Sequence, residues 1–191
     1  MALLTEGVVR DAAATELRKS FGQRSAHAVL AEAVRTHLTS FDVLLSHSRL
    51  DAELVLGVKN ILGNAGKTVY VDWLEDPQLD RSHVTAATAD VLRKRMDQCD
   101  SLFYIHSRNA TQSRWMPWEL GYFDGRKGNV AILPILKTGE GTFHGEEYLG
   151  LYPYIDFLDA TALGSSIWIH RNSTDYTRYE RWLAGTDKKR P

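Results

Sequence analysis

One acidic residue, Glu119, lies among aromatic side chains shortly after a segment with the pattern of a buried β-strand. The strand-like segment is 101–106, and the aromatic residues are Trp115 and Trp118. Pro117 is best tolerated in the first turn of a helix, so we expect the carboxylate near a helix start at a sheet edge. A carboxylate fixed there can stabilise the oxocarbenium-like centre of a breaking ribosyl bond. The alternative is a capping-type glutamate beside core tryptophans.

Polar residues at the end of a second strand-like segment, 41–46, supply donors suited to a diphosphate. They offer hydroxyl, imidazole and guanidinium groups above a helix start, whose free N–H groups also favour anions. These residues are Ser46, His47, Ser48 and Arg49. The alternative interpretation is a helix cap followed by a surface arginine.

A third strand-like segment ends at Asp72, which is followed by Trp73 and an acidic loop. Asp72 is a candidate for a hydrogen bond to a ribose hydroxyl, although aspartates at strand ends also cap loops. Trp73 is a candidate for stacking on nicotinamide or adenine, although tryptophans at such positions also anchor loops by packing.

The elements that position these residues alternate between strand and helix patterns. Such alternation predicts an α/β fold, with a parallel sheet covered by helices on both faces. Ligands bind outside the carboxyl ends of the strands in such sheets, so we expect the polar residues described above to meet at one edge. The predicted strands are 41–46, 68–72, 101–106, 130–136 and 152–158.

The remaining segments extend this core at both ends. Residues 5–38 predict a helical hairpin with a break at Gly22, and 174–184 predict a last helix before a loose tail. We therefore divide the chain into an N-terminal helical extension (1–40), a core (41–160) and a C-terminal helix and tail (161–191).

Composition excludes several classes of function. The 191 residues carry a formal net charge of -1, which provides no global basic field for nucleic acid or anionic lipid. The single cysteine, Cys99, is expected in a helix-like stretch facing the core; it rules out an intramolecular disulfide and fits a reducing compartment. The histidines lack metal-ligand spacing, and no apolar run is long enough to span a bilayer. We expect a soluble cytoplasmic protein without a metal site.

Three short segments, in this order, resemble the boxes of Toll/interleukin-1 receptor (TIR) domains of the bacterial stand-alone type. They are Phe41-Asp-Val-Leu-Leu-Ser-His-Ser-Arg-Leu-Asp51, Val69-Tyr-Val-Asp72 and the Trp-x-x-x-Glu pattern from Trp115 to Glu119. The resemblance covers about residues 41–160. It implies a flavodoxin-like fold with five parallel strands.

In the enzymatic branch of that family, the resemblance implies cleavage of NAD at the nicotinamide-ribose bond, with NAD as substrate and no separate cofactor. Glu119 falls on the catalytic glutamate, Trp115 on the motif tryptophan, and 46–49 on the loop that contacts the dinucleotide. The loop 72–76 corresponds to one that packs against a neighbouring subunit, which implies a homo-oligomer formed through TIR surfaces. This loop lacks the Pro-Gly pair of many receptor TIR domains.

Similar proteins of antiphage systems such as Thoeris make cyclic or otherwise modified ADP-ribose signals, so the resemblance also implies a separate nucleotide-sensing effector protein. Hydrolysis, cyclisation and base exchange remain open, because they differ only in the nucleophile that reaches the anomeric carbon. Two other functions are alternatives: a non-catalytic TIR scaffold that binds other TIR domains, and a related nucleoside glycosyl-transferring enzyme.

Overall fold

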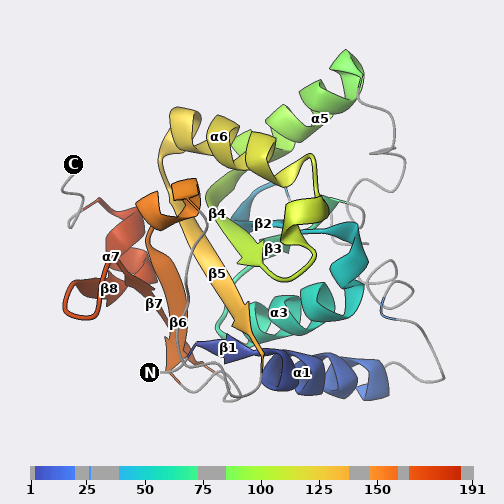
Figure 1. The fold of residues 1–191 in the computed structure, drawn as a ribbon, viewed down its shortest axis with the longest axis vertical. Coiled ribbons are helices and arrows are strands. Elements are labelled where there is room, and N and C mark those ends of the chain that lie inside the picture. The colour runs from blue at the N-terminus through green and yellow to red at the C-terminus, as the bar shows by residue number, and fades with distance from the viewer. Residues whose placement is uncertain are drawn as a thin grey trace.

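A computed structural model describes residues 3–19, 26, 39–72, 85–137, 147–158 and 164–185, which form a mixed sheet between two layers of helices (Figure 1). Its central part consists of five parallel strands in the order β3-β2-β4-β5-β6. They are β2 (Phe41–Ser46), β3 (Val69–Tyr70), β4 (Cys99–His106), β5 (Val130–Leu136) and β6 (Tyr154–Leu158). The predicted flavodoxin-like fold is confirmed. The bounds of β2 and β5 are those expected from the sequence.

The sheet continues beyond β6 with two antiparallel strands that the sequence analysis missed. β7 (Ser166–His170) pairs with β6, and β8 (Tyr176–Arg178) pairs with β7. The predicted helix over 174–184 is therefore wrong in its first half, and only α7 (Tyr179–Leu183) is helical. The edge of β7 supplies backbone partners to 176–178, and this pairing overrides the local helical pattern.

Helices cover both faces of the sheet and enclose two apolar cores. On one face, α3 (Ala52–Asn64) packs with α1 (Glu6–Lys19) over side chains such as Val43, Phe103 and Leu133. On the other face, α5 (Ala86–Asp97) and α6 (Met116–Lys127) cover side chains such as Leu102 and Ile132. The two layers are visible in Figure 1, with α3 and α1 below the sheet and α5 and α6 above it.

The described part of the N-terminal extension is packed into the fold. β1 (Leu4–Thr5) pairs in parallel with the end of β5, so that Leu4 lies opposite Ile135. α1 then lies along α3 and buries Val9 and Ala13 completely. The first helix of the expected hairpin is thus confirmed, whereas the break at Gly22 and all of the second helix except residue 26 fall outside the described residues.

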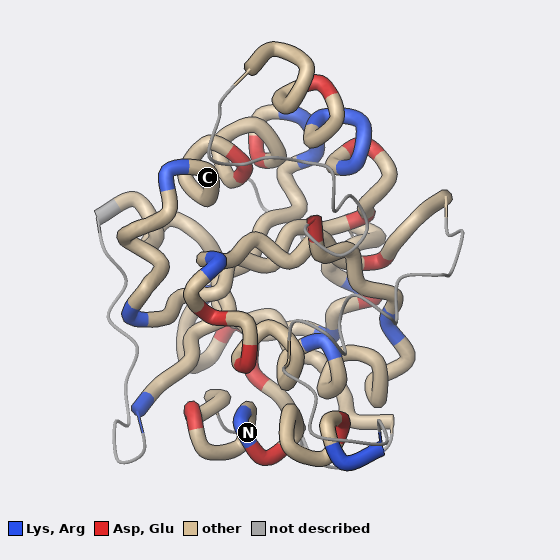
Figure 2. Tube along the Cα trace, turned by 90° about the vertical axis from the view of Figure 1, so that its right-hand side faces the viewer, with Lys and Arg blue, Asp and Glu red and all other residues tan. Residues whose placement is uncertain are grey.

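Charged residues of both signs are interspersed along the chain. Figure 2 shows Lys and Arg positions lying among Asp and Glu positions over the described trace, without a one-sided basic region. Several cations pair directly with acids, for example Arg126 with Asp97 and Lys67 with Glu180. Within the described ranges, no helix has the length and apolar character needed to cross a membrane.

Candidate active site

Glu119 lies in the first turn of α6, where the sequence predicted it. Pro117 occupies the start of this helix, where no partner for a backbone N–H is needed. The backbone N–H of Glu119 donates to the carbonyl oxygen of Trp115 at 2.8 Å. This helical bond joins the two ends of the Trp-x-x-x-Glu pattern, so Trp115 and Glu119 lie one helical turn apart. The side chain of Glu119 points inward, and only 1% of the residue is exposed.

Ser46 meets this carboxylate at the carboxyl end of β2. Its hydroxyl donates to Oε2 of Glu119 at 2.7 Å, although the two residues are 73 positions apart in the chain. Ser46 is itself only 1% exposed. Because a hydrogen bond from a hydroxyl to a carboxylate is short and strong, it fixes the orientation of the acid. The structure thus joins two of the candidate residues in one buried contact.

His47 and Asp72 form a second buried contact, between the ends of β2 and β3. Nδ1 of His47 lies 2.7 Å from the carbonyl oxygen of Leu45, and Nε2 lies 3.6 Å from Oδ1 of Asp72. Both residues are almost fully buried. This geometry ties the beginning of the loop after β3 to the loop after β2.

The other candidates of the loop after β2 differ in exposure. Ser48 is buried and caps the short 3-10 helix Arg49–Asp51, its side chain accepting a bond from the N–H of Leu50 at 3.4 Å. Arg49 is exposed, as a group that reaches for a diphosphate would be. Trp73 lies outside the described residues.

Trp115 begins a row of aromatic rings along α6. Its ring packs edge-to-face against Trp118 with centroids 5.5 Å apart, and Trp118 stacks on Tyr122 at 5.7 Å. The guanidinium of Arg93 on α5 lies 5.6 Å from the ring of Trp118. Trp115 is 9% exposed and belongs to the apolar core beneath α5 and α6.

The sequence analysis did not single out a third buried contact, which links the loops after β2 and β4. Asp51, 4% exposed, accepts hydrogen bonds from the hydroxyl of Ser107 at 2.5 Å and from the side-chain amide of Asn109 at 2.6 Å. Ser107 follows β4 directly, and Asp51 closes the segment that resembles the first TIR box. The rule that strand ends meet at one edge points to the segment that begins at Ser107, but no local pattern pairs it with Asp51.

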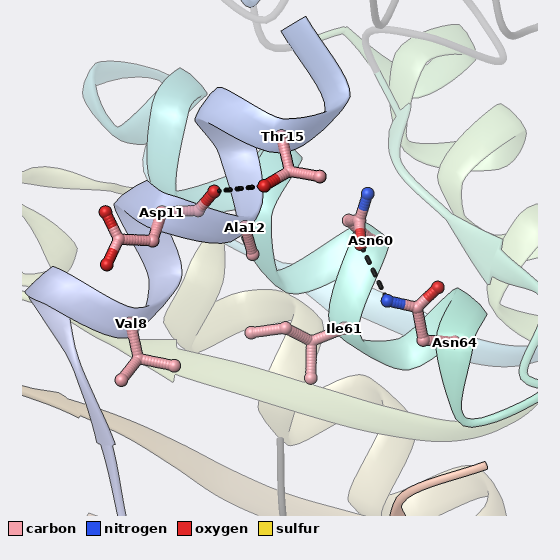
Figure 3. A pocket seen from close by; sticks show the side chains of 7 residues that line it. All are labelled: Val8, Asp11, Ala12, Thr15, Asn60, Ile61 and Asn64. Carbon is pink, nitrogen blue, oxygen red and sulfur yellow. Dashed lines mark hydrogen bonds between the residues drawn. The ribbon is translucent and has the colours of Figure 1, made fainter. Parts of the chain in front are cut away.

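A separate pocket of about 170 Å³ lies between α1 and α3. Polar groups around it already bond to neighbours, for example Thr15 to the carbonyl of Asp11 and Asn64 to Asn60 (Figure 3). Since α3 and α6 cover opposite faces of the sheet, this pocket is distinct from the surroundings of Glu119. It is lined by Val8, Asp11, Ala12, Thr15, Asn60, Ile61 and Asn64.

Cys99 lies in the core, as expected, but begins strand β4 and does not belong to a helix. Its thiol donates to the carbonyl oxygen of Arg95 at 3.2 Å. Burial raises the pKa of the thiol to about 12, so the reactive thiolate is suppressed. Among the described residues, no group of three or more His, Cys, Asp or Glu side chains is arranged to hold a metal ion.

Comparison with known proteins agrees with the three boxes. The profile of the TIR domain family matches residues 43–166. A Bacillus cereus protein named as the probable 3' cyclic ADP-D-ribose synthase ThsB' is 45% identical over 96% of this chain and 98% of its own length. A Cytobacillus dafuensis protein, provisionally named as the cyclic ADP-D-ribose synthase TIR2, is 30% identical over 43% of this chain and 22% of its own. The chain belongs to the TIR domain family.

Proposed function

We propose that this protein cleaves NAD between nicotinamide and ribose and closes the ADP-ribosyl unit into a cyclic ADP-ribose. The supporting observation is the buried Glu119 carboxylate, which Ser46 holds at the carboxyl end of β2. A non-catalytic scaffold would not need an acid in this position. Both relatives are named as cyclic ADP-D-ribose synthases, and ThsB' matches nearly the whole chain.

In the proposed reaction, the bond between C1′ of the ribose and the pyridinium nitrogen breaks, and its electron pair leaves with neutral nicotinamide. The sugar then carries the positive charge of an oxocarbenium ion. Glu119 stabilises this ion through its charge and through hydrogen bonds from ribose hydroxyls. The bond from Ser46 keeps the carboxylate from rotating, so little reorganisation is needed as the charge develops.

The fate of the cation depends on which nucleophile reaches C1′ first. Attack by water gives linear ADP-ribose, whereas attack by an atom of the same ADP-ribosyl unit gives a ring with loss of one proton. Glu119 is 1% exposed, so few water molecules can compete near it. We infer that NAD entry displaces the side chains that cover Glu119 and that the site closes again around the substrate.

The remaining candidates take supporting roles in this proposal. Ser48 and Arg49 bind the diphosphate at the start of the first 3-10 helix, and the pair of His47 and Asp72 holds the loops after β2 and β3 in register. Trp115 forms one side of the site, and Trp73 stacks on the nicotinamide or the adenine of NAD.

We further propose that the protein works in antiphage defence, as in Thoeris systems. Copies of the chain associate through TIR surfaces, so that the loop after β3 of one copy completes the site of another. The product is then a signal for a separate nucleotide-sensing effector protein.

The test is incubation of concentrated protein with NAD, with products resolved by mass. We expect nicotinamide and a product one water lighter than ADP-ribose. Loss of an electrostatic stabiliser typically costs about 10²–10³-fold in kcat, and we expect at least that for Glu119→Gln. Asp124→Asn removes an exposed acid on the same helix and is expected to leave the rate unchanged.

Equal rates for the parent and Glu119→Gln would refute the role of Glu119. Release of base from nucleosides but not from NAD would favour the nucleoside glycosyl-transferring alternative. No release from either substrate, with self-association intact, would favour the scaffold.

A further inference from the structure

Asp51 occupies a position from which an aspartate ordinarily caps a helix, yet it makes no such cap. It directly precedes α3, where an Asp side chain normally accepts a bond from a backbone N–H of the first turn. Here its side chain makes no capping bond. Both carboxylate oxygens instead accept bonds from another loop, that of Ser107 and Asn109.

These contacts form a closed arrangement around one buried charge. Oδ2 of Asp51 accepts from the hydroxyl of Ser107, and Oδ1 accepts from the side-chain amide of Asn109. The oxygen of Ser107 in turn accepts from the backbone N–H of Asn109 at 3.1 Å. Because a buried carboxylate is stable only when it is fully hydrogen-bonded, the loop after β4 is held in one position relative to Asp51.

A continuous series of hydrogen bonds leads from this point to the start of α6. The N–H of Ala110 donates to the carbonyl of Ser107, and the N–H of Ser113 donates to the carbonyl of Ala110. The hydroxyl oxygen of Ser113 accepts from the N–H of Met116, the first residue of α6. Glu119 follows in the first turn of that helix. This series connects Asp51 to the helix that carries Glu119.

Asp51 also lies five residues after Ser46, which bonds directly to Glu119. The loop after β2 therefore holds the segment from Ser107 to Glu119 at two points, through Ser46 at the carboxylate and through Asp51 at the segment's beginning. These two attachments add to the core packing of Met116 and Leu120 on α6, and together they restrict both the position and the orientation of the helix start.

We propose that Asp51 is a positioning residue that, through Ser107 and Asn109, sets the start of α6 and so the distance between Glu119 and Ser46. This inference rests on the proposed NAD cleavage for its kinetic readout, but its structural readout does not depend on it. In this proposal Asp51 makes no contact with the substrate. It acts through the loop after β4.

The kinetic test compares Asp51→Ala with the same change at Asp42, an aspartate near the start of β2, at the other end of that strand from the loop that carries Asp51. Asp42 also accepts two hydrogen bonds from one neighbouring loop, from the N–H and the hydroxyl of Thr68, both at 2.7 Å. For folded Asp51→Ala we expect kcat for nicotinamide release to fall about 10- to 100-fold, because a displacement of a catalytic group by about 1 Å has an effect of this size. KM is expected to stay within about threefold of the parent value. Asp42→Ala is expected to lower the melting temperature without lowering kcat.

A double-mutant cycle and two milder variants keep this test decisive if Asp51→Ala folds poorly. Asn109→Ala removes one of the two bonds, and Asp51→Asn keeps the shape of the side chain; both are expected to lower kcat less than Asp51→Ala. Combining Asp51→Ala with Ser107→Ala is expected to cost no more than Asp51→Ala alone, because the two residues act through one contact.

The structural test is hydrogen exchange of the parent and the variants, read by mass. Without Asp51, amides of 107–119 are expected to exchange faster while those of α3 keep their rates. Unchanged exchange in 107–119, or an equal increase over the whole chain, would overturn the proposal, as would a folded Asp51→Ala with kcat within twofold of the parent. If the parent releases no nicotinamide, the proposed function fails, and the exchange result alone decides the role of Asp51.

Discussion

Substitution of Gly57 by alanine tests how closely the N-terminal helix packs against the core. A Cβ built at Gly57 lies 2.0 Å from the carbonyl oxygen of Val9 and 2.8 Å from its Cγ1. The first of these atoms belongs to the backbone, so a change of rotamer cannot relieve the clash. α1 would have to move away from α3 by about 1 Å to reach even the 3.0 Å that real Cβ atoms rarely go below.

Two effects of opposite sign determine the change in the free energy of unfolding. Replacing glycine by alanine inside a helix favours folding by about 1 kcal/mol. Overpacking typically costs about 1–3 kcal/mol. Moving α1 away also exposes part of the Val9 side chain, whose complete burial stabilises the fold by about 1.5–3 kcal/mol. The second effect is larger. We expect a net loss of about 1–3 kcal/mol, and a melting temperature lower by about 3–10 °C in a chain of this size.

Gly63→Ala is the matched control, because it makes the same change in the same helix. No atom lies within 4 Å of a Cβ built there, so only the gain in helix propensity should remain. Thermal unfolding followed by circular dichroism compares both variants with the parent. Gly63→Ala is expected to melt at or above the temperature of the parent. If Gly57→Ala does so too, then α1 does not pack this closely against α3.

Two further predictions concern the site and the core. Ser46→Ala removes a hydrogen bond to a charged group, worth about 1.5–3 kcal/mol, and is expected to lower kcat for NAD by about 10- to 100-fold; an unchanged kcat would show that the bond does not orient Glu119. Burial raises the pKa of Cys99 to about 12, so at pH 8.5 the thiol of the folded protein should resist a thiol-specific chromogenic reagent and react only on unfolding. Rapid labelling of the folded protein would contradict this burial.

The alternating strand and helix patterns were sufficient to predict the five parallel strands. β2 and β5 have the predicted bounds, because their continuous apolar runs are typical of strands buried on both faces. The strands at the far edge were not predictable in the same way. Residues 176–178 lie in a sequence that also suits a helix, and only pairing with β7 makes them a strand.

The sequence by itself placed Glu119 at a helix start and Ser46 at a strand end, because proline tolerance and hydrophobic runs are local properties. The tertiary structure alone decided that the two side chains meet at 2.7 Å and that Glu119 is almost fully buried. It alone decided that Asp51 bonds to the loop after β4 instead of capping its own helix. These contacts join residues more than fifty positions apart, and their geometry depends on how the strands align in the sheet, which no local pattern encodes.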